Sequence, residues 1–349
     1  MVLDELRSPY LFCTPGTFPQ YHTLFHHIHN TTKILSLNDW KSIRTVCWKW
    51  KILAGEKPYF FIYWIGKSAD APVPKGASSV FMFNFLSPAL ALERIAHLGE
   101  TLTTLVYHHY FGSNDGFINE LMDNSSTLLN LKCLALSSTN TRKSFWKTLQ
   151  EDFPNLVSLT ILSKPNRGRG RYVLRRLEIL DIHDWEGFQL VCPSLKHLAI
   201  KPGNSVEVYK FVVEHGHQLE SFIAPEWPPR FRVVPADFWS TTFPNIITLG
   251  RPATGRPINC PSDHPLRHFL LTSVHQGTLL EHMLSEIDSF PQIRSVHIQT
   301  KDLLVDVVNE FRRRCEEKGI QIVEIVNGEI ECVPLSRLKA ALWWLPLHW

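Results

Sequence analysis

A short leucine-rich phrase recurs along most of the chain, and this repetition constrains the possible folds more than any other feature. In each copy, leucine-like residues stand at the first, fourth and sixth positions, and variable residues fill the others. The clearest copies begin at Leu131, Leu156, Leu177 and Leu195, and weaker ones begin at Leu102, Leu219, Ile246, Leu266 and Ile293. Successive copies start 18 to 29 residues apart. This periodicity predicts one supersecondary unit repeated along the chain.

The segments between the copies complete the unit. Three copies are preceded by phenylalanine, proline and an amide residue, at residues 153–155, 243–245 and 290–292. The proline ends the preceding helix, and the aromatic ring can cap the apolar layer before the strand begins. Apolar residues at helical spacing occur over residues 145–153, 279–287 and 303–311. Each unit is therefore predicted to be a short strand and a helix, with Gly216 and Gly319 at helix C-terminal caps.

The spacing of the phrase resembles that of leucine-rich repeats, which are 20–29 residues long. The resemblance implies an α/β solenoid that is curved, with parallel strands on the concave face and helices on the convex face. The asparagine that the family places shortly after each strand is missing, so we expect an irregular array without an asparagine ladder. A doubly wound βαβ domain is the alternative, because it also alternates strands and helices. The fixed phrase and its recurring lead-in favour the repeat array.

The variable residues of the phrase are the candidate binding residues. Side chains alternate between the two faces of a strand, so these residues are expected on the concave face. They are small, mostly neutral and include several histidines, which favours recognition of a protein or peptide by shape and hydrogen bonding. The expected substrate-binding residues are Ser158, Thr160, Asp181, His197, Ser221, His268, Ser295 and His297.

Composition and charge argue against several other classes of protein. Lys and Arg total 36 against 33 Asp and Glu, and this net charge of +3 predicts neither a nucleic-acid nor an anionic-membrane partner. The seven cysteines form no CxxC pair, which is typical of a reducing compartment. The N-terminus is acidic where a secretory signal is basic, and no apolar run approaches the roughly 20 residues of a membrane span. We therefore expect a cytoplasmic or nuclear protein.

Residues 1–66 lack the repeat and carry an amphipathic helical pattern. Over residues 37–54, Trp40, Ile43, Val46, Trp50 and Leu53 share one helical face. Such a short module buries little core by itself, so its apolar face either packs on the first repeat or binds a partner. A cap that covers the end of the array is the alternative to a partner-binding face.

The order of residues in this segment also resembles the F-box. Asp39, Ile43-Arg44, Val46-Cys47, Lys49-Trp50 and Leu53-Ala54 match the later helices of that motif, and Phe18-Pro19 resembles its opening Leu-Pro. With the repeats, the whole chain looks like a fungal-type F-box/leucine-rich-repeat protein. The resemblance implies that the F-box docks on the Skp-type adaptor of a cullin ubiquitin ligase and that the array holds a protein substrate. The implied adaptor-binding residues are Pro19, Leu24, Ile28, Trp40, Ile43, Val46, Trp50 and Leu53.

The remaining polar clusters do not form a chemical motif. His22 and His26 share a helix face but lack a third ligand, and Asp181, His183 and Asp184 fit an ordinary polar loop. The Gly-interrupted arginines from Arg167 to Arg171 could contact an acidic partner, although solvated loop residues are the default. No P-loop, GxSxG or GxGxxG motif is present, so we expect no enzyme activity, no cofactor and no metal.

The sequence thus predicts three parts: an F-box-like helical module over residues 1–66, an irregular leucine-rich-repeat array over residues 67–333, and a capping helix or tail over residues 334–349. The expected function is the substrate-recognition subunit of a Skp-cullin-F-box ubiquitin ligase. The alternative is a leucine-rich-repeat interaction scaffold whose F-box-like segment only caps the solenoid. An enzyme on a βαβ sheet is a third hypothesis, which requires titratable residues clustered at strand C-termini.

Overall fold

The fold is known from a computed structural model of the whole chain. The structure describes residues 61–65, 79–83, 88–108, 116–136, 142, 144–161, 170–185, 189–202, 206–224, 237–251, 260–271, 280–299 and 305–325. Two compact units divide the chain: unit 1 comprises Met1–Gly168 and Ile330–Trp349, and unit 2 comprises Arg169–Glu329. The F-box-like module and the C-terminal tail lie outside the described residues.

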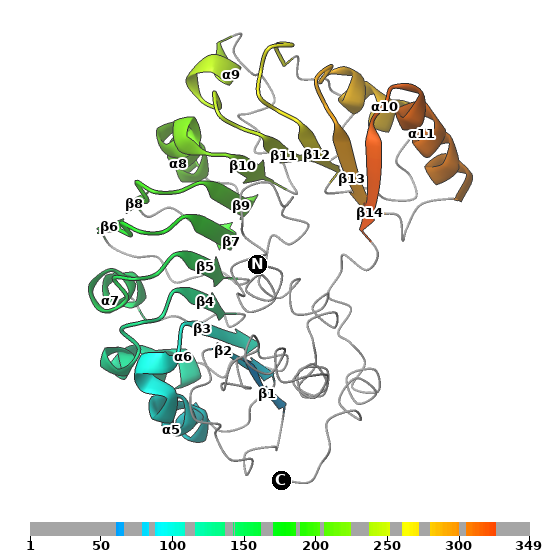
Figure 1. Cartoon of the computed structure of the whole chain (residues 1–349). Coiled ribbons are helices and arrows are strands. Elements are labelled where there is room, and N and C mark those ends of the chain that lie inside the picture. Colours follow the sequence, from blue (N-terminus) through cyan, green and yellow to red (C-terminus); the bar gives the residue numbers. More distant parts are fainter. Residues whose placement is uncertain are drawn as a thin grey trace, which may run out of the picture. The chain divides into compact units, whose positions relative to one another are not determined.

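Unit 1 contains five parallel strands that neighbour one another in chain order. Helices α5, α6 and α7 lie on one side of these strands (Figure 1). Its elements are β1 (Phe61–Ile65), β2 (Ser79–Phe83), α5 (Pro88–Leu98), η4 (Gly99–Thr101), β3 (Thr104–His108), α6 (Gly116–Asp123), η5 (Ser125–Thr127), β4 (Cys133–Leu136), α7 (Phe145–Asp152) and β5 (Ser158–Ile161).

Unit 2 repeats this plan with seven parallel strands in the order β7, β9, β10, β11, β12, β13, β14. Helices α8 to α11 lie on one side of them (Figure 1). The elements are β6 (Arg171–Val173), β7 (Ile179–Trp185), β8 (Gln189–Val191), β9 (His197–Pro202), α8 (Val206–His215), η6 (Gly216–Gln218), β10 (Ser221–Ile223), α9 (Phe238–Thr241), β11 (Thr248–Arg251), β12 (His268–Leu271), α10 (Leu280–Asp288), β13 (Ser295–Gln299), α11 (Val305–Glu317) and β14 (Gln321–Ile325).

The leucine-rich phrase determines where the strands lie. In all nine copies the strand begins two residues after the first leucine-like residue, from Thr104 after Leu102 to Ser295 after Ile293. These first residues are at most 6% exposed, and the second leucine-like residues are at most 1% exposed. Burial of each such side chain stabilises the fold by about 1.5–3 kcal/mol. The apolar core therefore follows the phrase from copy to copy.

Two of the three shortest steps of the repeat, from 156 to 177 and from 177 to 195, share an unusual local structure. In the described residues of these steps the connections contain the short strands β6 and β8, which pair in parallel as a separate two-stranded sheet. A step of 18 or 21 residues leaves little room for a helix after the strand and its turns, because even a two-turn helix takes about seven residues. These short steps thus coincide with the paired strands β6 and β8.

The lead-in residues form a ladder of side-chain hydrogen bonds between consecutive copies. Asn245 Nδ2 donates to the His217 carbonyl at 2.7 Å, and Gln218 Nε2 donates to the Cys192 carbonyl at 2.6 Å. In unit 1, Asn155 Nδ2 donates to the Leu129 carbonyl at 2.9 Å. Each donor stands directly before the first leucine-like residue of its copy. An amide ladder is therefore present, but it precedes the strands, where the family consensus does not place it.

Removing one rung of this ladder should cost a small, defined amount of stability. We expect Asn245→Ala to lower the free energy of unfolding by about 1 kcal/mol, because one hydrogen bond to a backbone carbonyl is lost. Asn245→Asp should cost at least as much, since it places a carboxylate against the His217 carbonyl. Urea denaturation of both variants measures this. Equal stability of wild type and Asn245→Asp would contradict a role for the rung.

The predicted fold class is confirmed at the level of an α/β protein with parallel strands and accompanying helices. The predicted helices appear as α7, α10 and α11. Gly319 follows α11 with a φ of +69°, as expected of a helix C-terminal cap. Among the helices in the described ranges, none has the length and apolar character needed to cross a membrane.

Candidate functional site

Strand register aligns the variable residues of unit 2 into two adjacent rows. The first row contains Ile179, His197, Ser221, Thr248, His268 and Ser295, and the second contains Asp181, Ala199, Ile223, Gly250, Leu270 and His297. Both rows lie on the face opposite the leucine-like residues, because side chains alternate along a strand. We call this face of unit 2 the polar face. Six of the eight predicted substrate-binding residues lie on it, and Ser158 and Thr160 occupy the corresponding positions of β5 in unit 1.

Most of these side chains are buried, which differs from the open surface that the sequence predicts. Ser158, Thr160, Asp181, Ser221, Ser295 and His297 are at most 6% exposed. One cause is visible in the register: small hydroxyl side chains stand between larger neighbours, as Ser295 does between His268 and Gln321. His197 and His268 are only half-buried. These two imidazoles are therefore the most accessible of the eight candidates.

Hydrogen bonds join three of the candidates on neighbouring strands. His268 Nδ1 lies 2.8 Å from Ser295 Oγ, and Ser295 Oγ lies 3.3 Å from His297 Nε2. The serine has a single hydroxyl proton, so it can donate to at most one of the two imidazoles and accepts from the other. The cluster thus fixes the orientation of both rings on β12 and β13.

The titratable groups of the polar face are shifted towards their neutral forms. Burial, with a smaller contribution from His268, lowers the pKa of His297 to about 3. Burial also lowers the pKa of His197 to about 4, and the nearby Lys196 adds to this effect. Burial raises the pKa of Asp181 well above its ordinary value. Neutral imidazoles both donate and accept hydrogen bonds, so this chemistry suits polar groups of a protein or peptide better than phosphate.

A serine bonded to an imidazole is also the first pair of a nucleophilic site. Here Ser295 is 6% exposed, and β13 pairs with β12 on one side and β14 on the other, which engages strand amides that could otherwise stabilise an oxyanion. Among the residues the structure describes, no three His, Cys, Asp or Glu side chains are grouped so as to hold a metal ion.

Arg251 is a polar residue of unit 2 that the sequence reasoning missed. It ends β11, occupies the position of the third leucine-like residue in its copy, and is 2% exposed. On β10, Ile223 pairs with Gly250, and the next residue is the small Ala224. On β12, Leu271 pairs with Arg251. A buried guanidinium is costly without compensating polar groups. The available signal was arginine at a position where the four clearest copies have leucine or isoleucine.

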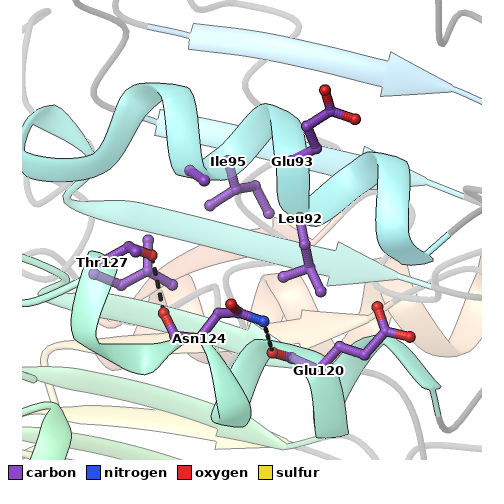
Figure 2. A pocket seen from close by; sticks show the side chains of 8 residues that line it. Leu92, Glu93, Ile95, Glu120, Asn124 and Thr127 are labelled. Atoms are coloured by element: carbon purple, nitrogen blue, oxygen red, sulfur yellow. Dashed lines mark hydrogen bonds between the residues drawn. The ribbon is translucent and has the colours of Figure 1, made fainter.

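A hollow of about 310 Å³ lies between α5 and α6 of unit 1 (Figure 2). Two of its polar side chains bond to nearby backbone: Asn124 Nδ2 donates to the Glu120 carbonyl at 2.8 Å, and Thr127 Oγ1 donates to the Asn124 carbonyl at 2.9 Å. Leu92, Ile95 and Leu128 supply apolar surface. Specific ligand sites need polar groups that converge on the ligand. Here the side chains of Asn124 and Thr127 instead bond to backbone carbonyls three or four residues earlier. The hollow is thus a weaker candidate than the polar face.

The adaptor-binding candidates lie outside the described residues. They are Pro19, Leu24, Ile28, Trp40, Ile43, Val46, Trp50 and Leu53. The same holds for His22 and His26 and for Arg167 and Arg169. Of the arginine run, Arg171 is described: it begins β6 and is exposed.

Comparison with known proteins adds no family assignment to this geometry. A scan against models of protein families gives no match, and a search of curated proteins gives no significant match.

Proposed function

We propose that this chain is the substrate-recognition subunit of a Skp-cullin-F-box ubiquitin ligase. In this proposal the repeats form a leucine-rich-repeat solenoid that binds a protein substrate, and the N-terminal segment binds the adaptor. The main support for the solenoid part of the proposal is the order of the strands: within each unit the parallel strands neighbour one another in chain order. In the nine copies, each strand also begins at the same position of the phrase. A doubly wound sheet reverses its strand order at a switch point, and the described strands of each unit follow one another without such a reversal.

Recurring backbone contacts support a repeat array as well. In eight of the nine copies, the first leucine-like residue donates its N–H to the carbonyl three residues earlier, as Leu156 does to Phe153 at 3.1 Å. The residues after it reach the previous copy: the N–H groups of Val157 and Ser158 both donate to the Lys132 carbonyl. A set of contacts repeated from copy to copy is typical of a solenoid, in which each unit packs only on its neighbours.

The proposed substrate contacts lie on the polar face. His197 and His268 are the accessible residues, and the neutral groups around them can exchange hydrogen bonds with a substrate backbone or with polar side chains. The proposed adaptor contacts are centred on Trp40, Ile43 and Trp50. A protein with this role acts in the cytoplasm or nucleus and needs no cofactor of its own.

The proposal predicts a specific adaptor complex. The purified chain should retain a Skp-type adaptor in a pull-down, and Trp50→Ala should weaken binding at least tenfold, because truncating a buried aromatic hot spot typically costs 2 kcal/mol or more. Lys51→Ala, on the other side of the same predicted helix, is the matched control and should bind like wild type. Circular dichroism checks that each variant is folded.

Two outcomes decide against this reading. If the wild-type chain fails to retain the adaptor where an established F-box protein does, the ligase function is wrong. If Trp50→Ala unfolds the chain and Trp50 has no separate effect on binding, the segment is a cap. The chain would then be a leucine-rich-repeat interaction scaffold, which is the second candidate.

A further inference from the structure

Two rungs near the lead-ins of unit 2 are histidines. His215, the last residue of α8, is 3% exposed, and its Nε2 accepts a hydrogen bond from the Cys192 N–H at 3.0 Å. Its Nδ1 lies 3.0 Å from the Phe211 carbonyl and therefore donates to it. The Cys192 carbonyl also accepts from Gln218. The turn before β9 is thus held at both its N–H and its carbonyl by the segment that leads into β10.

His264 replaces an amide rung in the copy that begins at Leu266. The residue directly before Leu266 is Pro265, which has no side-chain donor. Instead His264, 6% exposed, donates from Nε2 to the Phe243 carbonyl of the previous copy at 2.7 Å, and its Nδ1 accepts the Leu266 N–H at 3.2 Å. This copy lacks the usual bond from the first leucine-like residue to the carbonyl three residues earlier. The His264 imidazole thus replaces both the amide bond to the previous copy and the bond that normally holds the first leucine-like N–H.

Each of these contacts requires a neutral ring, because one nitrogen must accept a hydrogen bond. Protonation puts a ring N–H against the Cys192 N–H at His215, and against the Leu266 N–H at His264. Burial lowers the pKa of both histidines, partly offset by the backbone acceptors and by Glu214 and Asp263, while His217 and Arg267 lower the pKa further. The uncharged Phe211 ring stacks on His215 and Trp239 packs edge-on against His264.

We infer that His215 and His264 make the repeats of unit 2 sensitive to acid. Protonation of His215 breaks the hydrogen bond from the Cys192 N–H, which joins the turn before β9 to α8, and protonation of His264 breaks the bond from the Leu266 N–H in the turn before β12. The corresponding joint of unit 1 is held by Asn155, which does not titrate. Mild acid should therefore loosen the joints of unit 2 selectively. The bond from His264 to Phe243 survives protonation, so the His215 joint is the more sensitive one.

Amide hydrogen exchange of the full chain between pH 7 and pH 5 tests this inference. Protection factors remove the pH dependence of intrinsic exchange. Protection of the Cys192 amide should fall as the pH drops below the ordinary histidine pKa of roughly 6.5, by at most about tenfold per pH unit. The Leu156 amide, which bonds to Phe153 in unit 1 at 3.1 Å, should keep its protection and serves as the internal control.

Variants test whether the loss of Cys192 protection comes from the His215 imidazole. His215→Gln should keep Cys192 protection constant with pH, while His282→Gln, on the exposed side of α10, should leave the wild-type pH dependence intact. If His215→Gln does not fold, His264→Gln measured at the Leu266 amide makes the same test. Constant protection of Cys192 and Leu266 in wild type overturns the inference, as does an equal loss at Leu156. Neither result depends on adaptor binding.

Discussion

Phe243→Ala is expected to lower the free energy of unfolding by about 3–5 kcal/mol, the typical cost of removing a fully buried phenylalanine. Phe243 is 0% exposed. Its ring centroid lies 5.0 Å from that of Phe238 in an edge-on arrangement and 5.2 Å from that of Phe222. The ring fills the space between α9 and β10, where nothing small can replace it. Because aromatic pairs add stability beyond their buried area, this should be among the costliest single changes in unit 2.

Urea denaturation followed by tryptophan fluorescence measures this effect, since Trp239 lies 6.5 Å from Phe243 between ring centroids. Leu129→Ala is the control: Leu129 is 53% exposed, so its truncation should change stability by no more than about 0.5 kcal/mol. A loss below about 1 kcal/mol for Phe243→Ala would mean that the lead-in aromatic residues do not anchor the copies.

Gly216→Ala is the second large effect, with an expected loss of about 3 kcal/mol, at the upper end for overpacking. A Cβ atom at this position would lie 2.4 Å from the Thr242 carbonyl oxygen and 3.1 Å from the Phe243 ring. The obstacle is the backbone of the next copy, which cannot rotate away as a flexible side chain could. Gly216 is thus required for a close approach between consecutive lead-ins, and not for a left-handed φ.

The matched control is Gly170→Ala, also in unit 2. The nearest atoms to a Cβ at Gly170 are those of the Tyr172 ring at 3.7 Å, which is ordinary van der Waals contact. This variant should keep wild-type stability within about 0.5 kcal/mol. Thermal unfolding of the two variants side by side separates steric conflict from the general effect of replacing glycine. Equal melting temperatures would contradict the close approach at Gly216.

The strands and the core could be predicted from the sequence because they depend on local pattern. A leucine-like residue at the fourth position of the phrase, flanked by variable residues, already specifies a strand with one apolar face. The strand starts, the buried Phe153, Phe243 and Phe290, and the Gly319 cap all follow from such patterns. Each depends on residues close in sequence.

Features that depend on neighbouring copies were less predictable. The amide ladder was missed because the donors Asn155, Gln218 and Asn245 become a set only when the copies are aligned at their first leucine-like residue. Strands β6 and β8 were missed for a similar reason: the only sign of them in the sequence is the short steps on either side of residue 177, and the step from 246 to 266 is equally short. The burial of the polar face could not be predicted, because alternation assigns a side chain to a face but says nothing about how well that face is shielded.

Photo-cross-linking from position 50 tests the central claim most directly. A benzophenone amino acid in place of Trp50, irradiated with the chain mixed with a Skp-type adaptor, reports what this side chain contacts. The F-box proposal predicts a cross-link to the adaptor that is lost when unlabelled wild-type chain competes for it. A cross-link only to the chain's own repeats, unchanged by the adaptor, would contradict the proposal and identify the segment as a cap.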